Sequence, residues 1–115
     1  MTAPAIDRAI FEALKQTTGA EFVLELVDTF LQEAPSMLDE LRRALAAKDA
    51  DKFRRTAHSL KSNSNTFGAL TLGAMARELE LGGMAKVIES GGQPLDALGQ
   101  EYSRVAAALT DLQHE

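Results

Sequence analysis

The chain has 115 residues, of which 45% are apolar, and this suits one compact domain over residues 1–115. It contains no cysteine, which excludes disulfides, zinc–thiolate sites and thiol catalysis, and its formal charge of −5 makes it a poor general binder of nucleic acid. The sequence shows no apolar stretch of 18 residues and no signal-like start. We therefore expect a cytoplasmic protein without a membrane span.

The first third of the chain predicts two helices. Apolar residues at helical spacing over 6–14 indicate a short first helix that stops near Gly19. Thr18–Glu21 fits a capping box, in which the threonine hydroxyl would cap the start of the next helix. A wide apolar stripe over 22–31 predicts that two neighbours pack against this second helix. Pro35 lacks an N–H group, so it either kinks this helix or begins a new one.

A third long helix is predicted between Asp49, a suitable N-cap, and Gly68, which closes or bends it. The side chains that this helix would turn toward the core are apolar or small, and they recur at intervals of three and four. They are Phe53, Ala57, Leu60, Ser64 and Phe67.

The last third predicts two more helices with a loop between them. Apolar residues over 72–79 indicate a helix that ends at the glycine pair 82–83, and we expect residues 84–93 to form a loop. Pro94 suits the first turn of a final helix. Since no segment alternates with a period of two, we expect an all-α protein. The predicted architecture is an antiparallel four-helix bundle with an additional short N-terminal helix.

The charge is unevenly distributed along the chain. Residues 52–77 contain five bases and no acid, so this segment carries +5, while seven bases and 17 acids give the remainder −10. The five bases are Lys52, Arg54, Arg55, Lys61 and Arg77. His58 also lies in this acid-free segment. We expect the segment to form a local positive face.

One face of the predicted third helix collects polar residues spaced by three or four: Arg54, His58, Lys61, Ser62 and Asn65. A histidine on a helix is most often an ordinary surface residue, and two cations beside it stabilise nothing by themselves. The alternative is a nucleophile, because imidazole, whose ordinary pKa is about 6.5, presents a nitrogen lone pair at neutral pH. Lys61, one turn away, would then neutralise part of a phosphoryl group's charge. The residues themselves leave both interpretations open.

Residues 57–69 read AHSLKSNSNTFGA. They resemble the signature of histidine-containing phosphotransfer (HPt) domains, which is Ala-His-x-Leu-Lys-Gly followed by small residues, an apolar residue and Gly. The order of the helices, the chain length, the FLQEAP segment at 30–35 and the LE pair at 79–80 extend the resemblance over nearly the whole chain. Ser62 is the main departure, since the family usually has Gly there. Asn63 and Asn65 are also more polar than the usual small residues.

The resemblance implies a role for individual residues. His58 matches the phosphoacceptor, and Lys61 matches the residue that steadies the phosphoryl group. Glu80 falls where many members place a polar residue that hydrogen-bonds the histidine ring, although a solvated acid on the fourth helix explains it equally well. The residues expected to dock the partner are Arg54, Arg55, Ser62, Asn65 and Gly68.

The function that the resemblance implies is that of a phosphorelay intermediate in two-component signalling. His58 would accept a phosphoryl group from the aspartyl phosphate of a receiver domain and pass it to another receiver aspartate. The receiver would belong to a response regulator or a hybrid sensor histidine kinase. Mg²⁺ and the carboxylates that bind it would sit on the receiver, so we expect this chain to bind no metal or other cofactor.

We expect no autokinase activity, because the sequence has no Gly-rich nucleotide loop of the P-loop or kinase type. The alternative function is that of a non-catalytic helical bundle that docks an acidic partner through its third helix. Each apolar stripe can be buried within one bundle, so a monomer is expected.

Overall fold

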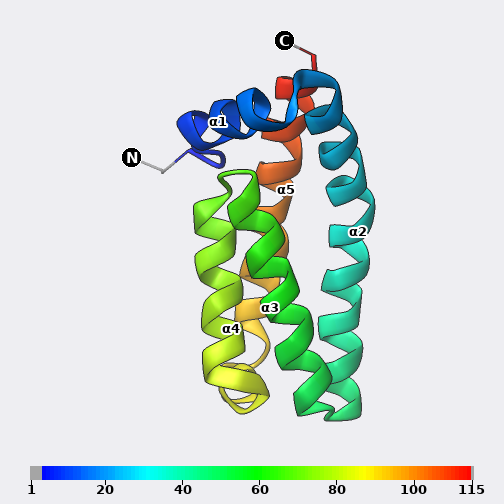
Figure 1. The fold of residues 1–115 in the computed structure, drawn as a ribbon. Helices are drawn as coiled ribbons and strands as arrows, with labels where there is room; N and C mark the ends of the chain where they lie inside the picture. The colour runs from blue at the N-terminus through cyan, green and yellow to red at the C-terminus, as the bar shows by residue number, and fades with distance from the viewer. Residues whose placement is uncertain (1–3, 115) are drawn as a thin grey trace.

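The computed structural model describes residues 4–114, and within this range the chain forms five helices and no strand. The helices are α1 (Arg8–Thr18), α2 (Ala20–Ala47), α3 (Ala50–Thr66), α4 (Leu70–Glu89) and α5 (Gln93–Gln113). The last four alternate in direction as an antiparallel bundle, and α1 lies across one end of it (Figure 1). The all-α prediction is confirmed. The part of the N-terminal expectation that concerns residues 1–3 lies outside the described range.

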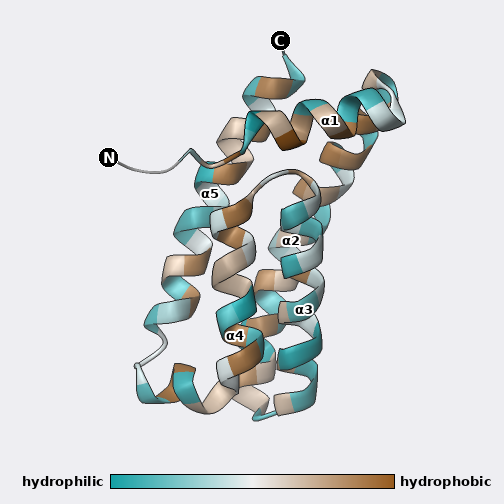
Figure 2. Ribbon diagram, turned by 60° about the vertical axis from the view of Figure 1, so that its left-hand side comes forward, coloured by the Kyte–Doolittle hydropathy of each residue, from teal (hydrophilic) through white to brown (hydrophobic). Residues whose placement is uncertain are grey.

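The core runs along the axis of the bundle, where each of the four long helices contributes fully buried side chains. Helix α3 packs most extensively against α4 and next against α2. The visible side of α3 is mostly hydrophilic in Figure 2, while its apolar side chains are turned inward. Within residues 4–114, no helix combines the length and apolar character that a bilayer span requires. The largest fully buried side chains are Leu41, Phe53, Leu60, Leu72, Leu98 and Leu109.

The helix starts agree with the prediction at α3 and differ from it at α2. The Asp49 carboxylate accepts a hydrogen bond from the Lys52 N–H, as an N-cap does. The predicted capping box at α2 is wrong. Only Gly19 separates α1 from α2, so Thr18 still belongs to α1 and its hydroxyl donates to the carbonyl of Leu14, 2.8 Å away.

Helix α2 departs from the prediction at two positions. It continues through Pro35 as one helix, so this proline does not begin a new one. Phe22, which the sequence places in the apolar stripe, is half exposed. The neighbouring helices instead cover the side of α2 that carries Val23, Val27 and Phe30, all of which are buried.

The predicted end of the fourth helix is only partly right. Gly83 does interrupt α4, because its φ of 72° and ψ of −177° are not helical. The expected loop over 84–93 is wrong in its first half, since residues 84–89 resume the helix and Val87 is buried. A buried apolar anchor explains why this short stretch is ordered against the bundle. Pro94 lies in the first turn of α5, as predicted.

Candidate functional site

The core fixes which way the polar face of α3 points. Ala57 and Leu60 are fully buried, and their neighbours His58 and Lys61 therefore lie on the side of α3 that borders α4. The His58 side chain is 56% exposed, whereas that of Lys61 is 23% exposed. The histidine is accessible to another protein, and the lysine lies deeper in the seam between the two helices.

A tight connection at Gly68 sets the antiparallel register of α3 and α4. Gly68 has a φ of 84°, a left-handed conformation that favours glycine, and Ala69 N–H closes the end of α3 by binding the carbonyl of Ser64 at 2.9 Å. Further along the seam, a Cβ placed on Gly73 would collide with the side-chain oxygen of Asn65. Glycine at 73 therefore lets the two helices approach closely beside the site.

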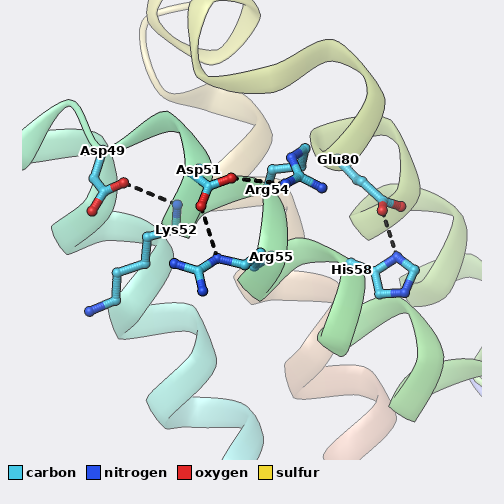
Figure 3. A network of polar contacts seen from close by, with 7 residues as sticks. All are labelled: Asp49, Asp51, Lys52, Arg54, Arg55, His58 and Glu80. Atoms are coloured by element: carbon cyan, nitrogen blue, oxygen red, sulfur yellow. Dashed lines mark hydrogen bonds and ion pairs between the residues drawn. The ribbon is translucent and has the colours of Figure 1, made fainter.

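One carboxylate from α4 binds both functional side chains of α3. Glu80 Oε2 lies 2.6 Å from Nδ1 of His58, and Glu80 Oε1 accepts a hydrogen bond from Lys61 Nζ at 3.0 Å. The Glu80 side chain is only 14% exposed. Figure 3 shows the imidazole with Nδ1 directed at Glu80 and its other nitrogen directed away. The structure thus brings together His58 and Lys61, to which the resemblance assigned roles, and Glu80, whose role the sequence left open.

The electrostatics of Glu80 settle where the proton of the imidazole lies. The hydrogen bond from Lys61, and after it the contact with His58, lowers the pKa of Glu80 from its ordinary value of 4.5 despite partial burial. An ionised carboxylate only accepts hydrogen bonds, so in this pair Nδ1 must donate. The neutral ring then carries its lone pair on Nε2, on the side away from Glu80.

The expected positive face is not acid-free in the folded chain. Arg54 Nη2 lies 2.8 Å and Arg55 Nε 3.2 Å from the two oxygens of Asp51. Lys52 Nζ lies 3.6 Å from Glu40 on α2. The carboxylates come from outside residues 52–77, either from the adjacent turn or from other helices. In the folded chain the bases of the acid-free segment therefore share their surface with carboxylates from outside the segment.

The predicted docking residues divide between surface and interior. Arg54, Arg55, Ser62 and Asn65 are exposed on α3. Gly68 is buried and does not lie on the exposed surface of α3. Its carbonyl accepts a hydrogen bond from the N–H of Asp7 at 2.8 Å, and a Cβ on it would lie 2.7 Å from the Asp7 carbonyl. Gly68 thus joins the end of α3 to the start of α1.

Sequence reasoning missed Gly73, whose signal was a glycine near the start of a predicted apolar helix. Such a glycine usually marks a turn or a close approach, and here it marks the close approach of α3. Among residues 4–114, the His, Asp and Glu side chains do not gather in groups of three that could hold a metal ion.

Comparisons with known proteins place this arrangement in a family. A family model described as Hpt domain matches residues 25–115. The sensor protein TorS of Escherichia coli K12 is 32% identical over 102 residues, which are 87% of this chain, although the chain spans only about a tenth of TorS. A solved structure of histidine-containing phosphotransfer protein B from Pseudomonas aeruginosa PAO1 matches with a TM-score of 0.88 and 26% identity, covering 98% of this chain and 97% of that one.

A second solved structure agrees in fold. It is the HPT domain of a hybrid histidine kinase from Shewanella, with a TM-score of 0.73 and 18% identity, and the match covers 94% of this chain and 92% of that one. At this identity the likeness concerns the fold alone.

Proposed function

The chain belongs to the Hpt domain family and is a phosphocarrier of two-component phosphorelays, and from this premise we propose that His58 carries the phosphoryl group. The observation that supports the assignment is the 2.6 Å contact between Nδ1 of His58 and Glu80. It orients an exposed imidazole and directs Nε2, which carries the lone pair in the neutral tautomer with Nδ1–H, away from Glu80. A nucleophile of this kind is ready for attack without a separate general base.

The transfer step follows from this geometry. The Nε2 lone pair attacks the phosphorus of an aspartyl phosphate on the receiver, a new N–P bond forms, and the P–O bond to the aspartate breaks. The electron pair of that bond leaves on the aspartate oxygen, which becomes a carboxylate. The imidazole gains a formal positive charge because Nδ1 keeps its proton, and ionised Glu80 stabilises that charge. The reverse of the same step delivers the phosphoryl group to the next aspartate.

Lys61 serves as the cation that steadies the phosphoryl group. At rest its ammonium binds Glu80 at 3.0 Å, and this contact uses one of its three N–H donors. The other two remain available to oxygens of a phosphoryl group on the histidine one turn away. Glu80 thereby positions both the imidazole ring of His58 and the ammonium group of Lys61.

The partners that fit this chemistry are receiver domains of response regulators or of hybrid sensor histidine kinases. The exposed side chains of Arg54, Arg55, Ser62 and Asn65 would form the docking surface around the histidine. Mg²⁺ would be carried by the receiver, where it would offset charge on the transferring phosphoryl group. The chain would act as a cytoplasmic monomer without autokinase activity of its own, and without binding nucleic acid.

Phosphotransfer from a radiolabelled, phosphorylated receiver domain tests the assignment. We expect acid-labile, base-stable label on the wild-type chain, no label on His58→Gln, and full label on His114→Gln, which removes the other histidine. Label on His58→Gln would contradict the site. A wild-type chain that binds the receiver and takes no label would instead support a non-catalytic docking module.

A further inference from the structure

Besides Lys52, which is paired with Glu40, Arg77 is the base of the segment 52–77 to which the proposed mechanism gives no role. Its side chain is exposed on α4, and within residues 4–114 the structure gives it no ion pair or hydrogen bond. The other four bases of the segment each bind a carboxylate: Lys52, Arg54, Arg55 and Lys61. An unpaired arginine retains all five N–H donors of its guanidinium for a ligand.

The register of the seam places Arg77 beside the site. Two contacts fix this register, since His58 meets Glu80 and Asn65 meets Gly73. The step from His58 to Asn65 is seven residues forward along α3, and the step from Glu80 to Gly73 is seven residues backward along α4, as antiparallel helices require. Position 77 therefore lies level with Lys61, one helical turn before Glu80.

The side of α4 on which Arg77 lies is also defined. Ala76, the preceding residue, is fully buried, and Glu80, three positions later, lies in the seam. At 100° per residue, Arg77 lies beyond Glu80 as seen from Ala76, and it is exposed, which puts it on the solvent side of the seam. Nε2 of His58 is likewise directed away from Glu80 (Figure 3). The long side chain of Arg77 can therefore reach the region where a phosphoryl group on Nε2 would lie.

The charge of the site shows why a second cation is needed there. At rest the charge of Lys61 is balanced by that of Glu80. A phosphoryl group on Nε2 brings several negative oxygens to a site that already holds a carboxylate only 14% exposed, and the positive charge that the ring gains offsets only part of this negative charge. Lys61, already shared with Glu80, offsets only part of the remainder.

We propose that Arg77 is a further catalytic residue, whose guanidinium binds the phosphoryl oxygens on His58 and stabilises the phosphorylated form of the chain. This inference rests on the proposed role of His58. The planar fork of guanidinium N–H donors matches phosphate oxygens better than an ammonium does, so lysine at this position is an imperfect substitute.

The equilibrium of phosphoryl exchange between the receiver and this chain tests the proposal. Removing a group that only docks the receiver changes the rates in both directions and leaves this equilibrium unchanged. Removing a group that binds the phosphoryl oxygens shifts the equilibrium toward the phosphorylated receiver. For Arg77→Ala we expect an equilibrium constant about three- to tenfold lower, with Arg77→Lys in between. Arg43→Ala, which removes an exposed arginine of α2, is the matched control.

A second measurement needs no partner. In the isolated phosphorylated chain, the ³¹P resonance followed against pH gives the midpoint at which the phosphoryl group is protonated, and loss of a bound cation raises that midpoint. We expect a higher midpoint for Arg77→Ala than for the wild type and for Arg43→Ala. An equilibrium and a midpoint equal to wild type would overturn the proposal. Absence of label from wild type, or its presence on His58→Gln, would instead contradict the role of His58.

Discussion

Two carboxylates each bind two basic side chains of α3, and they differ in the helix to which they belong: Asp51 lies on α3 itself and Glu80 on α4. Asp51 binds Arg54 and Arg55, three and four residues later in the same helix, and its side chain is 65% exposed. Glu80 binds two residues of another helix, 22 and 19 positions earlier in the chain, and its side chain is 14% exposed.

The pKa values do not separate the two clusters, whereas burial and geometry do. A hydrogen bond from Arg54 lowers the pKa of Asp51, just as one from Lys61 lowers that of Glu80. Helical spacing alone brings the residues of the Asp51 cluster together. Solvent screens these exposed ion pairs, so they contribute little to stability. The second cluster is sheltered between two helices and holds an imidazole in one orientation. Only the second can therefore control a reaction.

The largest effect that we expect from this comparison concerns the rate of phosphotransfer. Glu80→Ala removes the acceptor of Nδ1–H, so the ring loses its preferred orientation and tautomer. Orienting carboxylates behind histidines are typically worth about 10- to 100-fold, and we expect a loss of that size. Asp51→Ala should lower the rate less than about threefold, because it affects only exposed arginines. Rapid-quench measurements with a phosphorylated receiver give both rates.

Glu80→Gln sharpens this result, because the amide oxygen can still accept from Nδ1–H while the negative charge is gone. Its rate should lie between those of wild type and Glu80→Ala. An equal loss of phosphotransfer rate in the Glu80 and Asp51 variants would mean that the two clusters contribute equally to the reaction. Circular dichroism of each variant checks that the helices remain formed.

A smaller effect is expected from the lysines that belong to the two regions. Lys61→Ala removes the ammonium that binds Glu80 and steadies the phosphoryl group, and we expect transfer about tenfold slower with unchanged helical content. Lys52→Ala, which breaks an exposed pair with Glu40, is the matched control and should stay close to the wild-type rate. Loss of helical signal in Lys61→Ala would show that this lysine is structural.

The smallest effect is on stability against acid. The pKa of Glu80 is lowered in the folded chain, so its contribution to stability is fully present above the ordinary value of 4.5 and is lost as pH falls through the lower, folded value. Urea unfolding of wild type and Glu80→Gln from pH 7 to pH 3 measures this. The difference between their midpoints should shrink below pH 4.5. A difference that stays constant with pH would mean that Glu80 is not coupled to its two partners.

How far the sequence predicted the site depended on the distance along the chain that each inference had to cover. His58 and Lys61 are one turn apart, and their shared face follows from helical spacing together with the signature around them. Glu80 lies 22 residues from His58, and the sequence left its role open between a ring partner and a solvated acid. Gly68 was misplaced because the same signature residue can serve either a surface or a turn.

The prediction of the fold was limited by distance along the chain in the same way. Apolar periodicity predicted the helices, because burying one face of a helix requires that spacing whatever the partner is. It did not predict that 84–89 would be helical, since the buried Val87 is held there by the rest of the bundle. Nor did it predict that Thr18 would bind back into its own helix.

By itself the sequence determined an all-α chain with a histidine and a lysine on one face of its third helix, because those features depend only on residues within one or two turns of each other. The tertiary structure decided which acid binds them, which of the five bases are already paired, and that Arg77 has no partner beside the site within residues 4–114. These contacts arise only when the connection at Gly68 and the packed core fix the register of α4 against α3. The segment 52–77 contains no acid, yet in the folded chain its histidine is bound by Glu80, which lies 22 residues away in the sequence.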